Sequence, residues 1–122
     1  MSNASSADAE AAIQSTVDAA AAMGALPSHA RYHVLQKIAG GLYDRREEFA
    51  RLMTAESGKP IADAKREASR AVQTFTVAAE EAKRIPGEVI PLDWTPGTDS
   101  HLGILRRVPI GPVLGITPSI FP

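Results

Sequence analysis

The chain has 122 residues, of which 44% are hydrophobic and 22% are charged, a net charge of −1 and no cysteine. This length suits one domain, and this composition is that of an ordinary globular protein. The missing cysteine excludes disulfides, cysteine metal sites and a thiol nucleophile within the chain. The near-neutral charge and the lack of a long apolar run argue against nucleic-acid and membrane partners. Because residues 1–10 also lack the basic and apolar parts of a secretory signal, we expect a cytoplasmic protein.

The first two thirds of the chain predict helices, because alanine is abundant there and proline is rare. We expect a disordered end at residues 1–7 and a first helix at residues 8–23. Ser28 is a good N-cap for a second helix. Asp44 followed by Glu47 resembles a capping box, which would open a third helix.

A fourth helix is predicted at residues 60–85, after a glycine that suits a helix end and a proline that suits a first turn. Its apolar positions recur every three or four residues, at Ile61, Ala64, Ala68, Val72, Phe75, Ala79, Ala82 and Ile85. The helix would be about 39 Å long, so its stripe needs a long partner. One hypothesis is therefore a helical interaction or oligomerisation module that uses the stripe of residues 61–85.

The proline-rich remainder predicts extended chain and turns. We expect strands at residues 89–92 and 102–108, and a strand buried on both faces at residues 113–116. A strand buried on both faces needs neighbouring strands and covering side chains. Because the sequence supplies at most three short strands, the pattern indicates the front part of a larger α/β domain.

Two candidate sites in the helical part favour ordinary structural roles. His29 and His33 have the spacing of zinc ligands on one helix face, but Ala30 stands where a metalloprotease has glutamate and no third ligand follows. We therefore expect surface histidines and no metal site. Lys59 follows a glycine but lacks the other residues of a phosphate-binding loop, so we expect a helix-junction residue.

The last sixteen residues, 107–122, allow two interpretations. They fit a strand between rigid turns, and they also fit a strand whose carboxyl end contacts a ligand, as in open α/β sheets. Here the sequence resembles the aldehyde dehydrogenase superfamily. The matching stretches are Arg107-Val108-Pro109-Ile110-Gly111-Pro112 with Ile116-Thr117-Pro118-Ser119-Ile120-Phe121-Pro122, and upstream Arg31-Tyr32-His33-Val34-Leu35, Glu56-Ser57-Gly58-Lys59-Pro60, residues 67–84 and Pro86-Gly87-Glu88.

The resemblance implies an α/β fold in which residues 8–122 form the N-terminal part of a Rossmann-type cofactor domain, incomplete by itself. Residues 8–85 would be helical and residues 86–122 extended, with residues 102–107 in an oligomerisation sheet. Members of this family oxidise a small aldehyde to an acid with NAD or NADP and form homo-oligomers. A cysteine attacks the aldehyde, a hydride passes to the nicotinamide, and a glutamate activates water. The carried-over cofactor contacts are Ile116, Thr117, Pro118 and Ser119.

Two departures from the family pattern affect this segment. Ser119 stands where the family has an aromatic residue, and Ile120 stands where the family has the asparagine that stabilises the oxyanion. An isoleucine donates no hydrogen bond, and the loss of one such donor costs about 10²–10³ in rate. Since the cysteine and the downstream glutamate are also missing, we expect no catalytic residue in this chain, no activity from it alone and no cofactor bound by it alone.

Overall fold

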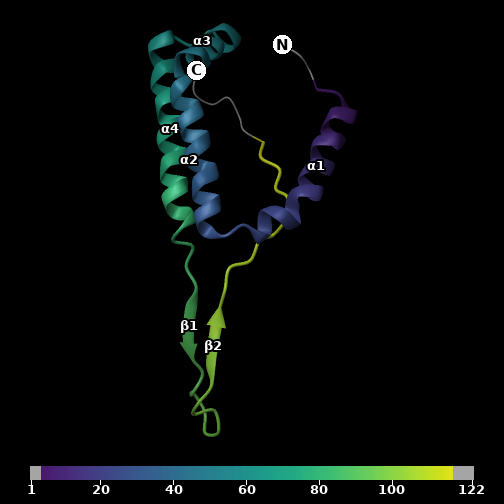
Figure 1. Cartoon of the computed structure of the whole chain (residues 1–122), viewed down its shortest axis with the longest axis vertical. Helices are drawn as coiled ribbons and strands as arrows, with labels where there is room; N and C mark the ends of the chain where they lie inside the picture. Colours follow the sequence, from purple (N-terminus) through teal and green to yellow (C-terminus); the bar gives the residue numbers. More distant parts are fainter. Residues whose placement is uncertain (1–3, 117–122) are drawn as a thin grey trace.

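The computed structural model describes residues 4–116. These residues form four helices and a two-stranded sheet, in the order α1 (Ser6–Ala25), α2 (Ser28–Asp44), α3 (Arg46–Ser57), α4 (Ile61–Ala82), β1 (Glu88–Pro91) and β2 (Leu102–Leu105). Figure 1 shows α2, α3 and α4 together, with α1 apart from them and the sheet extending beyond the helices. The fold is thus mostly helical, with one small sheet.

Local hydrogen bonds shift the predicted start of α1. The helix begins at Ser6, two residues before the expected Asp8, because Ser5 and Asp8 form a capping box. The Asp8 carboxylate accepts from the N–H of Ser5 at 2.8 Å, and the Ser5 hydroxyl accepts from the N–H of Asp8 at 3.2 Å. These bonds satisfy backbone groups that would otherwise lack partners at the helix end.

The two N-caps predicted from the sequence, at Ser28 and Asp44, are wrong. Ser28 is the first residue of α2 and makes no capping bond, since Pro27 occupies the N-cap position. Asp44 is the last residue of α2. Helix α3 begins at Arg46, and Arg45, the one residue between the two helices, provides no side-chain cap. Arg45 there donates to both carboxylate oxygens of Glu48, at 2.8 and 2.7 Å, so an ion pair replaces the expected capping box. The expected end of the third helix is confirmed, because Gly58 adopts a left-handed φ of 73°.

The helical layer packs through alanines. Helices α2 and α4 run antiparallel (Figure 1), and α3 also packs on α4. The buried apolar side chains among the described residues are Ala39, Ala50, Ala64, Ala68, Ala79 and Ala82. Because an alanine side chain is a single methyl group, the helix backbones can approach closely. The predicted stripe is therefore largely a packing face within the chain, with only its ends, Ile61 and Ile85, exposed by 42% and 52%.

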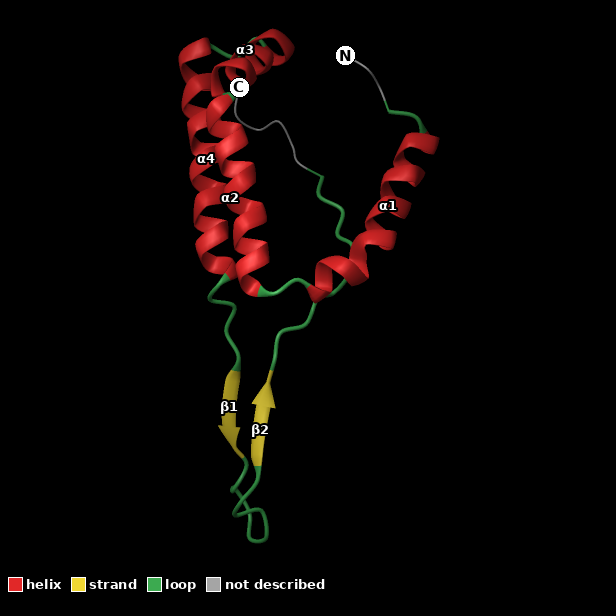
Figure 2. Cartoon of the chain, viewed as in Figure 1, coloured by secondary structure: helices red, strands yellow, loops and turns green. Residues whose placement is uncertain are grey.

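Helix α1 packs differently from the other three. None of its residues is buried, and its larger apolar side chains, Ile13, Val17 and Met23, are 57%, 50% and 53% exposed. Figure 2 shows it joined to α2 by a short connection and directed away from α2 and α4. The amphipathic spacing predicted its helix correctly, but the described residues do not cover its apolar side.

The sheet is an antiparallel hairpin in which Glu88 pairs with Leu105 and Pro91 pairs with Leu102. The two predicted strands thus exist, although the second ends at Leu105 rather than at residue 108. The predicted buried strand at residues 113–116 is wrong. These residues form no strand, and Val113 and Leu114 are 75% and 79% exposed, because no strand among the described residues lies beside them to share backbone hydrogen bonds.

The alanine contacts predict a strong dependence on side-chain size. Ala79 is fully buried, so Ala79→Leu should force the helices apart and lower the free energy of unfolding by about 1–3 kcal/mol. The matched control is Ala62→Leu on the exposed side of α4, which should change stability by less than about 0.5 kcal/mol. Urea unfolding followed by circular dichroism measures both. Equal effects would contradict close helix packing at Ala79.

The capping box predicts a pH dependence in α1. Hydrogen bonds from the hydroxyl and the N–H of Ser5 lower the pKa of Asp8. A lowered folded-state pKa stabilises the helix above the unfolded pKa, and this contribution is lost as the pH falls through the folded pKa. We therefore expect the helicity of residues 6–12 to fall below about pH 4, as measured by NMR chemical shifts. Asp8→Asn should remove this dependence, whereas Glu10→Gln should retain it.

Candidate functional site

The segment after β2 returns along the helices and passes the end of α1. A Cβ atom added to Gly24 would lie 3.5 Å from Cγ of Pro109, so the proline ring lies against the last turn of α1. Gly111 has a φ of 99°, a conformation that favours glycine and turns the chain there. The segment therefore contacts α1 at Pro109 and turns two residues later, at Gly111.

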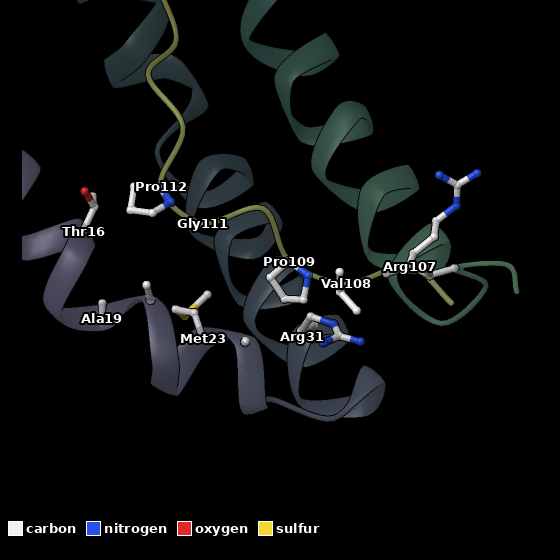
Figure 3. Close-up of a pocket in the computed structure, with 12 residues that line it drawn as sticks. Thr16, Ala19, Met23, Arg31, Arg107, Val108, Pro109, Gly111 and Pro112 are labelled. Carbon is white, nitrogen blue, oxygen red and sulfur yellow. The ribbon is translucent and has the colours of Figure 1, made fainter. Parts of the chain in front are cut away.

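A cleft of about 600 Å³ lies between this segment and α1. Figure 3 shows its two sides, with α1 on one side and the proline-rich segment on the other. The lining residues are Thr16, Ala19, Ala20, Met23, Gly24, Arg31, Ile85, Arg107, Val108, Pro109, Gly111 and Pro112. Most of them are apolar, and two arginines add positive charge.

Arg31 lines the cleft and also forms hydrogen bonds with the residues that connect α1 to α2. Its Nη1 donates to the carbonyl of Leu26 at 2.6 Å, and its Nη2 donates to the hydroxyl of Ser28 at 3.3 Å. Its Nε is buried and has no hydrogen-bond partner among the described residues. Arg31 belongs to one of the stretches that resemble the aldehyde dehydrogenase superfamily, but its bond to Leu26 depends on how the chain turns between the two helices.

The predicted cofactor contacts lie at the end of this segment. Ile116 is in the described part and is 87% exposed. Thr117, Pro118, Ser119 and Ile120 lie outside the described residues. The structure therefore brings Ile116 together with no other predicted site residue, and those predictions stay untested.

The helical part of the chain can be examined for a metal site at the two histidines and for a helix that could cross a membrane. His29 and His33 are both exposed on α2. Within residues 4–116, no three His, Cys, Asp or Glu side chains gather closely enough to hold a metal ion. In the same part of the chain, no helix has the length and apolar character needed to cross a membrane.

A polar groove on α4 contains a buried charge that sequence analysis missed. Lys59 lies at the junction of α3 and α4, as predicted, but its side chain is only 8% exposed and its Nζ pairs with Glu67. A second ion pair, between Lys65 and Glu47 at 2.9 Å, links α4 to α3, and the hydrogen bond from Lys65 lowers the pKa of Glu47. The only sequence signal for the first pair was an acidic residue two helical turns after the lysine.

The Lys59–Glu67 pair predicts unequal effects of removing its two partners. Glu67→Gln leaves a buried ammonium group without its counter-charge, which should lower the free energy of unfolding by about 1–3 kcal/mol. Lys59→Met keeps the apolar stem and removes the charge, so its effect should be smaller. Asp63→Asn, which breaks the exposed pair with Arg66, should cost at most about 1 kcal/mol. Urea unfolding distinguishes these variants, and a larger loss in Lys59→Met would contradict this account.

Comparison with known proteins identifies the family. The sequence profile of the aldehyde dehydrogenase family matches residues 1–122. The chain belongs to the aldehyde dehydrogenase family. The resemblance inferred from the motifs is thereby confirmed.

Curated relatives and a solved structure show which part of the family the chain matches. It is 44% identical to 3-sulfolactaldehyde dehydrogenase of Priestia aryabhattai over 75% of this chain and 19% of that protein. It is 38% identical to a probable NADP⁺-dependent succinate-semialdehyde dehydrogenase of Sinorhizobium fredii over 95% of this chain and 23% of that protein. Aldehyde dehydrogenase 21 of Physcomitrella patens, solved with its reaction product succinate, matches with a TM-score of 0.77 and 46% identity over 83% of this chain and 21% of that one. The chain thus spans about a fifth of the length of these aldehyde dehydrogenases and corresponds to their N-terminal portion.

Proposed function

We propose that this chain supplies the N-terminal helices and hairpin of an NAD(P)-dependent aldehyde dehydrogenase that oxidises a small aldehyde to a carboxylic acid. The observation that carries this proposal is the match to the Physcomitrella patens enzyme, in which both fold and sequence agree over 83% of this chain. Residues 8–122 would form the first part of the cofactor-binding domain. Residues 8–85 of this part would be helical, and residues 86–122 would be extended.

The chemistry of the family divides between this chain and the rest of the enzyme. Covalent oxidation of an aldehyde needs a thiolate nucleophile and a base for the water that hydrolyses the thioester. This chain contains no cysteine, so another part of the dehydrogenase must supply the nucleophile. The contribution proposed for this chain is positional, because its extended segment would bring residues 116–119 to the cofactor.

The described residues near the end of the segment could contact a ring of a dinucleotide cofactor but not its pyrophosphate. Ile116 offers exposed apolar surface, which suits contact with a ring, and the open space around Gly115 allows close approach. Neither residue offers the cationic group or the cluster of N–H donors that a pyrophosphate requires. NAD or NADP, whose nicotinamide accepts the hydride, therefore needs residues from elsewhere in the enzyme, and we propose that this chain alone binds neither.

The exposed hairpin supports a sheet that is completed by other strands. Val89, Leu102 and Ile104 lie on the same face of the hairpin and are 64%, 67% and 73% exposed, although an apolar face of a sheet is normally covered. We propose that further strands of the complete homo-oligomeric enzyme cover them. The competing hypothesis of a helical module loses support, because α2 and α3 already cover most of the stripe at residues 61–85.

The first test is activity. The purified 122-residue chain should produce no NADH or NADPH from short aldehydes. A chimera in which this chain replaces the matching N-terminal portion of the Physcomitrella patens enzyme should fold and produce reduced cofactor. Absorbance at the nicotinamide band measures both. A chimera that folds and stays inactive even with Ile120→Asn would contradict the proposal.

The oxyanion position predicts the effect of one substitution within that chimera. Ile120→Asn would restore an N–H donor for the oxyanion and should raise kcat by about 10²–10³. Ala62→Asn, which introduces the same amide on the exposed side of α4, should leave kcat unchanged. Stopped-flow or steady-state measurement of cofactor reduction gives the ratio. An unchanged kcat for Ile120→Asn would remove residue 120 from the oxyanion site.

A further inference from the structure

A small apolar pocket lies among three helices, at the end of the helical layer that is remote from the hairpin (Figure 1). Its volume is about 170 Å³. An apolar cavity of about 150 Å³ is large enough to bind benzene, so this pocket has room for one ring. The residues that line it are Leu42 from α2, Phe49 and Met53 from α3, and Glu67, Ala68 and Ala71 from α4.

Two of the lining side chains favour an aromatic occupant. The ring of Phe49 can pack edge-to-face or offset against a second ring, and the thioether of Met53 makes favourable contacts with ring edges. Both side chains are half-buried, so the surrounding helices restrict their movement. Because Ala68 and Ala71 end in a single methyl group, they leave open the space that the ring would occupy.

The pocket borders the polar groove of α4, which has a volume of about 570 Å³. Glu67 and Ala71 line both cavities, so the two are contiguous. A ligand whose ring occupies the pocket therefore extends its other end into the groove. The remaining residues of the groove are Lys59, Asp63, Arg66, Arg70 and Thr74.

Arg70 is the cation of this groove that lacks a counter-charge. Glu67 pairs with Lys59, and Asp63 pairs with Arg66, whereas Arg70 forms no ion pair among the described residues. Its side chain is exposed and so open to a ligand. A guanidinium group binds a carboxylate through two parallel hydrogen bonds. One unpaired positive charge matches one carboxylate, whereas a phosphate dianion would leave excess negative charge beside Glu67.

We infer that the pocket and Arg70 together form a binding site for a small aryl carboxylate. The ring lies among Leu42, Phe49 and Met53, and the carboxylate accepts hydrogen bonds from the guanidinium of Arg70. The site goes beyond the proposed function, because it needs neither the nicotinamide cofactor nor the thiol nucleophile. For a ligand of this size with an exposed ion pair, the dissociation constant is on the order of 1 mM.

The first test titrates the 122-residue chain with 3-phenylpropionate and follows the amide chemical shifts by NMR. Saturable shifts should centre on Leu42, Phe49, Met53 and residues 70–71. Two further compounds separate the halves of the site. Phenylpropanol carries the ring without the charge and acetate carries the charge without the ring, so each should bind at least about fivefold more weakly than 3-phenylpropionate.

Two arginine variants test the role of the charge. Arg70→Gln should raise the dissociation constant of 3-phenylpropionate about fivefold or more and leave that of phenylpropanol unchanged. The matched control is Arg51→Gln, which removes an exposed arginine of α3 that lines neither cavity. This control should change the dissociation constant by less than about twofold, because distant exposed charges are screened. Both variants should keep the helicity of the parent chain.

The same two variants in the chimera test the site within a dehydrogenase. Bound 3-phenylpropionate should raise the melting temperature, and Arg70→Gln should reduce this rise while Arg51→Gln should not. A carboxylate that binds elsewhere in the enzyme would give equal rises in both variants. Equal dissociation constants of the two variants in the chain, or equal rises in the chimera, would overturn the site. Neither readout needs catalysis, so an inactive chimera would contradict only the proposed oxidation.

Discussion

The structure depends on the close contact of α4 with α2 and α3 through alanine side chains. Fully buried alanines such as Ala64 and Ala79 contribute little apolar area each, but they let long stretches of helix backbone lie together. This contact fixes the direction in which the chain leaves α4. The hairpin and the returning segment follow from that direction, so the position of Pro109 beside α1 depends on helices that are distant in sequence.

A core made of alanines also explains what the described part of the chain leaves uncovered. No large side chain among the described residues is fully buried, while Ile104, Ile110 and Leu114 are mostly exposed. Burial of these side chains would add about 1.5–3 kcal/mol each. The apolar content that the sequence assigns to a core is therefore present, but it lies on the hairpin, α1 and the returning segment. The larger dehydrogenase that we propose would cover these surfaces, which would account for their composition.

Two polar interactions among the described residues hold connections between helices. Arg31 binds the carbonyl of Leu26 between α1 and α2, and Lys59 pairs with Glu67 where α3 turns into α4. Both cations are more buried than an isolated surface charge would be, so each restrains the chain at a turn. The motifs that matched the dehydrogenase family contain both residues, and these local bonds give a physical reason for basic residues at these two positions.

The sequence by itself determined the helices, the hairpin strands and the family. Helical periodicity, Gly58 and the proline distribution depend on neighbouring residues, so they could be read without the fold. The sequence could not determine the caps at Ser28 and Asp44, because a competing ion pair of Arg45 with Glu48 and a proline N-cap decided them. Tertiary structure alone decided which apolar stripe is covered, that residues 113–116 form no strand here and that a cleft opens beside α1. A strand or a buried face needs a partner in space, and patterning along one chain shows only that a partner is needed.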